Sequence, residues 1–268
     1  MKYDILIFNG QSNMQGQSDT LIEKVVDNAY EYKFLTDSFR ELCDPCGENV
    51  LKDLTKGYDC QDEFQIPKWV SEHALGASYK GNTTLIPSFV QAYLSNSNKK
   101  AIAISVAKGS TSISDWEKGE SLYNALIAKV NGAINKVGKE NVGKKYLIFL
   151  QGESDQLNKT SEEEYKRLLI KYKNDLKNDI GIDKFGIIKV GAFAKAFNNG
   201  TGDKAIMSAQ ESVVKEDLDF IMLTKKSSEL FENPKYINDK FVGHFNALAL
   251  TIIGEDAGKN LKGESQNV

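Results

Sequence analysis

Short and nearly continuous runs of apolar residues recur along the chain, separated by longer and more polar segments. Runs of this kind are typical of strands that are covered on both faces, as in a parallel sheet. We therefore predict strands at residues 5–8, 101–106, 146–150, 187–193 and 220–223.

The segments between these runs carry helical patterns. Apolar residues recur at every third or fourth position over residues 122–137, and again over residues 165–176, which follow a capping box that begins at Ser161. Further helices are predicted after Pro87, because proline suits a first helical turn, and over residues 247–253. Alternating strands and helices predict an α/β fold, a three-layer α/β/α domain with right-handed crossovers and a central parallel sheet of about five strands.

One domain accounts for residues 1–262, and residues 263–268 are expected to fray. Residues 17–86 are polar and show no clear strand, so we predict a loop-rich insertion there that walls a pocket. With 268 residues, of which 41% are hydrophobic and 26% charged, the chain has the composition of an ordinary globular protein. A chain of this length buries enough surface to fold without a disulfide or a metal.

Charge and hydropathy exclude some partners. A net charge of -3 with no basic stripe predicts no nucleic-acid partner, and the lack of a long apolar stretch predicts no membrane partner. Residues 1–8 run directly into an apolar strand, so we expect no signal peptide and a cytoplasmic protein. A secreted protein whose signal peptide had been removed would look the same, and the oligomeric state stays open.

Cysteines are few and lie close together. Cys43, Cys46 and Cys60, with His73 as the nearest fourth ligand, have spacings that suit a zinc knuckle or a redox pair. The odd number of cysteines argues against a disulfide framework, and we favour reduced thiols in a loop. We predict neither a metal nor a cofactor.

Two polar blocks follow predicted strands, where a parallel sheet places its sites. The first, residues 9–16, holds Ser12 between two glycines at the expected start of a helix, whose free N–H groups suit an oxyanion. Ser12 could equally be a helix cap. The second block, residues 107–116, contains Gly109, whose missing side chain lets its N–H approach a ligand oxygen.

Two further blocks complete the set. Residues 149–155 place Gln151, Glu153 and Asp155 at a strand end, where structural hydrogen bonding is the simpler interpretation. Residues 239–246 contain His244, one of only two histidines in the chain. The order, with a serine first, a glycine and an amide between, and a histidine last, favours a catalytic assignment.

These blocks together resemble the SGNH hydrolases in their sialate O-acetylesterase-like form, carbohydrate esterase family 6. Residues 10–14 with Gly16 resemble the first block of that family, residues 109–116 its Gly-Gly-Thr-x-Ile-x-x-Trp block, and residues 151–155 its Gln-Gly-Glu-x-Asp block. His244 lies where the family's C-terminal histidine belongs.

The resemblance implies a flavodoxin-like fold and hydrolysis of acetyl esters on sugars. It implies that Ser12 is the nucleophile, that His244 is the general base, and that the oxyanion hole consists of the Ser12 and Gly109 N–H groups with the Gln151 side chain. Support for the substrate or the site is predicted for the remaining motif residues, Gln11, Asn13, Thr111 and Glu153.

The chain departs from the family pattern twice. Ser110 replaces a glycine, and Phe241 stands where the family often has the aspartate of its triad, three residues before the histidine. We expect Asp239 to be the catalytic acid, since a carboxylate on the second ring nitrogen fixes the tautomer. Glu153 or Asp155, or a backbone carbonyl or water without any acid, are the alternatives.

The leading hypothesis is a serine esterase that removes O-acetyl groups from a small carbohydrate, sialic acid or a related sugar. A lipase-like or thioesterase-like hydrolase acting on longer acyl chains is the first alternative. A non-catalytic carbohydrate-binding module is the second, since Phe241 leaves the triad incomplete. A nucleotide-binding domain is disfavoured, because residues 9–16 match neither a Gly-x-Gly-x-x-Gly turn nor a P-loop.

Overall fold

The computed structural model describes residues 2–34, 36–47, 82–197 and 203–266. The described residues form a seven-stranded sheet in the order β3-β2-β4-β1-β5-β6-β7, in which β3 runs antiparallel to β2 and the other neighbours are parallel. The strands are β1 (Tyr3–Gly10), β2 (Val26–Lys33), β3 (Ser38–Leu42), β4 (Lys100–Ala107), β5 (Val142–Leu150), β6 (Lys184–Ile188) and β7 (Phe220–Thr224).

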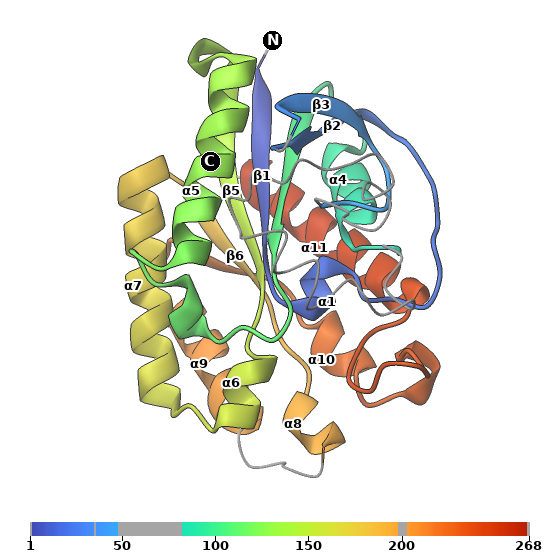
Figure 1. Cartoon of the computed structure of the whole chain (residues 1–268), viewed down its shortest axis with the longest axis vertical. Coiled ribbons are helices and arrows are strands. Elements are labelled where there is room, and N and C mark those ends of the chain that lie inside the picture. The colour runs from blue at the N-terminus through green and yellow to red at the C-terminus, as the bar shows by residue number, and fades with distance from the viewer. Residues whose placement is uncertain (1, 35, 48–81, 198–202, 267–268) are drawn as a thin grey trace.

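Helices cover both faces of this sheet (Figure 1). On one face α4 (Ile86–Leu94) packs against α11 (Ala247–Gln266), and on the other lie α5 (Ser121–Val137), α7 (Glu162–Ile180) and α9 (Asp203–Glu216). Shorter elements fill the connections: α1 (Ser12–Gln15), η2 (Ile113–Trp116), η3 (Lys139–Asn141), α6 (Glu153–Asn158), α8 (Phe193–Ala196), α10 (Lys226–Leu230) and η4 (Pro234–Tyr236). The predicted three-layer α/β/α fold is confirmed.

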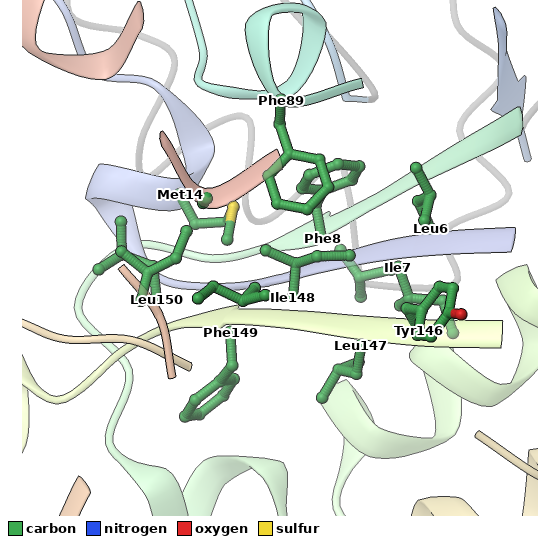
Figure 2. Close-up of a cluster of buried hydrophobic side chains, with 14 of the residues drawn as sticks. Leu6, Ile7, Phe8, Met14, Phe89, Tyr146, Leu147, Ile148, Phe149 and Leu150 are labelled. Atoms are coloured by element: carbon green, nitrogen blue, oxygen red, sulfur yellow. The ribbon is translucent and has the colours of Figure 1, made fainter. Parts of the chain in front are cut away.

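The core forms where the central strands meet the helices on each side. Side chains of β5 alternate, so that Leu147 and Phe149 point to one helical layer and Ile148 to the other (Figure 2). Phe8 of β1 meets Phe89 of α4 edge to face, with ring centroids 5.2 Å apart. Burial of each such side chain contributes about 1.5–3 kcal/mol to the free energy of folding. Because both faces of these strands are buried, their sequences are unbroken apolar runs.

Two strands lie inside the segment 17–86, for which the sequence predicted a loop-rich insertion without strands. β2 and β3 extend the sheet beyond β4, so the prediction of about five strands was too low. Their charges hid them, because Glu31 is buried and pairs with Arg40 at 2.7 Å and Lys33 at 3.1 Å. Residues 48–81 of this segment, including Cys60 and His73, lie outside the described residues.

The strand predicted over residues 187–193 ends earlier, at Ile188. Beyond it, glutamine side chains rather than a neighbouring strand satisfy the backbone: Val190 N–H donates to Gln210 Oε1 at 3.0 Å and Phe193 N–H to Gln156 Oε1 at 2.8 Å. Apolar residues there remain buried in a loop and a short helix, which a pattern of hydrophobicity alone does not separate from a strand.

The predicted helices are present, and Ser161 Oγ accepts a hydrogen bond from Glu164 N–H at the start of α7. The helix α11 continues to Gln266, into the segment predicted to fray, and Lys262 near its end donates to Ser95 Oγ, just after α4.

The strand order also locates the crevice of the sheet. The neighbouring strands β1 and β4 connect in opposite directions: the chain runs from β1 to β2 on one side of the pair, and from β4 to β5 on the other. In open α/β sheets, ligands bind outside the carboxyl ends of strands at such a switch. α1, α6 and α8 all lie at this end of the molecule (Figure 1).

Candidate active site

Ser12 is placed by a tight turn at the end of β1. Gly10 has φ +154°, and a side chain there would overlap the Leu150 carbonyl of β5, so only glycine lets the two strand ends approach. Ser12 then opens α1, and the N–H of a first helical residue has no partner within its helix. The sequence expectation of a serine at a helix start is confirmed in its geometry.

His244 approaches Ser12 from the loop that precedes α11. Its Nε2 lies 2.8 Å from Ser12 Oγ, and its Nδ1 lies 2.9 Å from the carbonyl oxygen of Val242. A carbonyl can only accept, so Nδ1 carries the proton and Nε2 is left to accept from the Ser12 hydroxyl. This is the tautomer that a general base requires.

Asp239 does not occupy the position that the sequence assigned to it. Among the described residues no hydrogen bond joins Asp239 to His244, and the Asp239 side chain is exposed. The turn is built on its neighbour Asn238, which is buried and accepts from Lys240 N–H through its side chain and from Phe241 N–H through its carbonyl. The carbonyl alternative, here Val242, is the arrangement that the structure contains.

The imidazole lies among aromatic rings. Phe193 and Phe241 approach it edge to face, with ring centroids 6.1 Å and 6.0 Å from that of His244. Desolvation in this setting is the largest cause that lowers the pKa of His244 below its ordinary 6.5. The ring is therefore neutral, and able to accept a proton, over a wider range of pH.

Gly109 lies directly against Ser12. A Cβ atom on Gly109 would be 3.5 Å from Ser12 Cβ, 3.4 Å from Gln15 Oε1 and 3.2 Å from Gln17 Nε2. The next residue, Ser110, has φ +61°, a conformation that favours the glycine it replaces. Thr111 is buried, donates to Lys108 O at 2.9 Å and accepts from Trp116 Nε1 at 3.2 Å, which holds this turn closed.

The contacts of Gln151 contradict the prediction that its side chain is a third oxyanion donor. Its side chain is fully buried, and its Nε2 donates to Thr111 O at 2.9 Å and to Asp155 Oδ2 at 2.6 Å. Tyr165 OH donates to Gln151 Oε1 at 2.9 Å. Because an amide nitrogen has two hydrogens, none remains for a substrate oxygen. Gln151 instead ties the turn after Gly109 to α6.

With this geometry described, the chain can be compared with known proteins. The sequence model of the family described as carbohydrate esterase, sialic acid-specific acetylesterase, matches residues 59–256. The chain belongs to this family. No curated protein matches it in sequence.

Solved structures share the fold of this esterase. NanS is similar with 12% identity and a TM-score of 0.67 over 99% of this chain and 98% of its own. A protein from Arabidopsis thaliana is similar with 14% identity and a TM-score of 0.65 over 97% of each chain. Membership of the family makes the protein a carboxylic ester hydrolase, and the two structural likenesses show its three-layer α/β/α fold.

The remaining motif residues of the esterase join its loops. Gln11 is buried, and its Oε1 accepts from Ser154 N–H at 3.2 Å. Asn13 Nδ2 donates to Glu153 Oε1 at 2.9 Å. Asp155 is buried and accepts from Ile113 N–H at 2.9 Å, and desolvation is the largest cause that raises its pKa. Neither acid that the sequence kept as an alternative is hydrogen-bonded to His244 among the described residues.

Two functional features of the esterase escaped sequence reasoning. The Val242 carbonyl has no sequence signal, since every residue carries one. Tyr165 donates to Gln151 Oε1 and orients its amide, but the sequence pattern showed it only as one of the apolar positions of a helix. Within the described ranges no group of three metal-ligating side chains occurs, Cys43 and Cys46 are free thiols, and no helix has the length and apolar character needed to cross a bilayer.

Gln151→Ala is expected to destabilise the fold as well as slow catalysis. It leaves Thr111 O, Asp155 and Tyr165 OH without their buried partner, which costs roughly 2–4 kcal/mol. Urea unfolding measures this loss, with Gln91→Ala on the exposed face of α4 as the control. If unfolding were unchanged while kcat fell about 10²–10³-fold, Gln151 would be an oxyanion donor after all.

Glu153→Gln is expected to stabilise the esterase at high pH only. Glu153 is buried and its Oε2 has no partner among the described residues, and desolvation raises its pKa from 4.5 to about 7. The folded chain keeps a proton that the unfolded chain loses, so stability falls as pH rises from 4.5 to about 7. Glutamine removes this loss, up to about 3 kcal/mol. Urea unfolding should show the gain at pH 8 and none at pH 4, and equal gains at both would contradict it.

Proposed function

We propose that the protein removes acetyl groups from O-acetylated sugars, sialic acid or a related amino sugar, through an acyl-enzyme on Ser12. The observation that carries the proposal is the 2.8 Å contact between His244 Nε2 and Ser12 Oγ. His244 takes the hydroxyl proton as Ser12 Oγ bonds to the acetyl carbon. The same proton then passes to the sugar oxygen as the ester C–O bond breaks, and a water repeats the sequence to release acetate.

The negative oxygen of the tetrahedral intermediate would be held by the backbone N–H groups of Ser12 and Gly109. The first has no partner in its helix, and the second lies in a turn that contacts Ser12 and has no side chain to obstruct the approach. Gln151 and Thr111 act behind this turn by fixing its position. The positive charge that His244 gains is shared with the Val242 carbonyl rather than with a carboxylate.

The surroundings of Ser12 favour a polar alcohol as leaving group. Gln15 and Gln17 lie beside Gly109 and are partly exposed, so hydrogen-bonding groups line that side of the serine. A sugar can use these amides, whereas a long acyl chain would desolvate them without replacement. The family description, a sialic acid-specific acetylesterase, supports the same substrate class.

Hydrolysis rates on a matched panel test this proposal. We expect faster release of acetate from O-acetylated sialic acid than from acetylated xylose, and a steep decline along nitrophenyl esters from acetate to octanoate. Rates that rise with chain length would instead identify the lipase-like alternative, while binding of acetylated sugar without turnover would identify a non-catalytic module. Activity unchanged by EDTA is expected, since each proposed step uses only side chains and backbone groups of this protein and a water.

A further inference from the structure

His244 lies in a segment of turns whose own backbone hydrogen bonds include the N–H and the carbonyl of His244. Between Ile237 and α11 the chain makes turns rather than regular structure, with one isolated bridge between Ile237 and Phe245. Transfer of a proton at a 2.8 Å contact tolerates little displacement of the ring. These backbone bonds fix the shape of the segment, whereas its distance from Ser12 depends on contacts with elements outside it.

Asn13 contacts the segment on both sides of His244. Its Oδ1 accepts from Phe245 N–H at 3.1 Å, and its Nδ2 donates to Gly243 O at 3.3 Å. Asn13 is also the neighbour of Ser12 on α1, and its side chain is almost fully buried. One short side chain thus joins the serine's own helix to the residues immediately before and after the histidine.

We propose that Asn13 is a positioning residue that sets the distance between His244 and Ser12, and that Glu153 orients its amide. The inference rests on the proposed function, for which it names the residue that assembles the catalytic pair. Glu153 supports it because Asn13 Nδ2 donates to Glu153 Oε1 at 2.9 Å, and the carboxyl group comes from α6, outside the histidine segment.

Only a carboxamide satisfies all three contacts. Phe245 N–H needs an acceptor, whereas Gly243 O and Glu153 Oε1 need donors, and asparagine presents an acceptor and a two-hydrogen donor at this length. Aspartate keeps the acceptor and loses the donor. In a buried position it would also place a second carboxyl group against Glu153.

The amide of Asn13 and the carboxyl group of Glu153 can be exchanged between the two positions, so that the hydrogen bond between them is kept with its direction reversed. In the double variant Asn13→Asp with Glu153→Gln, the glutamine at position 153 donates to the carboxylate at position 13 and Phe245 N–H keeps its acceptor, so that only Gly243 O loses its donor. Asn13→Asp alone should reduce kcat about 10–100-fold with little change in KM. The double variant should return kcat to within about threefold of native, and Asn124→Asp on the exposed surface of α5 controls for the added charge.

A second readout does not depend on activity. The chain has only two histidines, so NMR of ¹⁵N-labelled imidazoles resolves His244 once His244→Ala assigns its signals. We expect the Nδ1–H signal of the bond to Val242 O in the native protein, its loss in Asn13→Asp and its return in the double variant. If the native protein shows this signal but hydrolyses no ester, the proposed function fails while the positioning role can still be measured.

The positioning role is overturned if folded Asn13→Asp keeps native kcat and an unchanged His244 spectrum. It is also overturned if the folded double variant recovers neither. Should Asn13→Asp fail to fold, Asn13→Ser replaces it, because serine keeps an acceptor without adding a charge. Loss of the His244 signal in that variant supports the proposal, and a native signal overturns it.

Discussion

Ser12→Ala is expected to reduce kcat by at least about 10³-fold while the fold remains intact. No other hydroxyl takes its place, because in the proposed mechanism the acyl-enzyme forms on the oxygen that His244 Nε2 contacts at 2.8 Å. The substitution removes one oxygen and leaves His244, which is only half buried, able to bind water instead. The midpoint temperature of thermal unfolding should therefore change by no more than a few degrees.

Steady-state hydrolysis of nitrophenyl acetate measures this loss, and a fluorophosphonate probe measures it independently of turnover. Mass spectrometry should find the phosphonyl adduct on Ser12 in the native protein and none in Ser12→Ala. Ser114→Ala, an exposed serine of η2, is the matched control and should label and turn over normally. Native kinetics in Ser12→Ala, or labelling at another serine, would end the serine-hydrolase proposal.

His244→Ala is expected to be nearly as damaging as Ser12→Ala, because the hydroxyl cannot lose its proton without the base. The two groups act as one unit, so the double variant should be scarcely slower than either single variant.

The dependence of kcat/KM on pH tests the same role of His244. Only neutral imidazole accepts the proton, so kcat/KM should rise as His244 deprotonates, with a midpoint below 6.5 because burial lowers the pKa of this ring.

Asp239→Ala is the matched control for the histidine experiment. The Asp239 side chain is exposed, and Val242 O rather than Asp239 contacts His244 Nδ1 at 2.9 Å, so turnover should stay within about threefold of native. A large loss in Asp239→Ala would mean that the loop rearranges to bring the carboxylate to the ring. A pH profile that is flat between pH 5 and pH 8 would exclude His244 as the base.

The sequence by itself determined the layered fold and pointed to Ser12 and His244, the pair that the structure brings together. Strands covered on both faces must be apolar throughout, so β1, β4 and β5 are visible as runs without any knowledge of their partners. Ser12 and His244 were visible because one lies in a glycine-flanked turn after a strand and the other is one of two histidines. Chemistry that requires a rare residue type leaves a trace in the sequence.

Tertiary structure decided how those side chains are supported. β2 was hidden because the charge of Glu31 is balanced by Lys33 and by Arg40 on β3, which hydropathy does not record. The partner of His244 Nδ1 is a carbonyl, a group that every residue has, so no sequence pattern could indicate Val242 instead of Asp239. The orientation of the Gln151 amide, too, depends on groups that only the folded chain brings together.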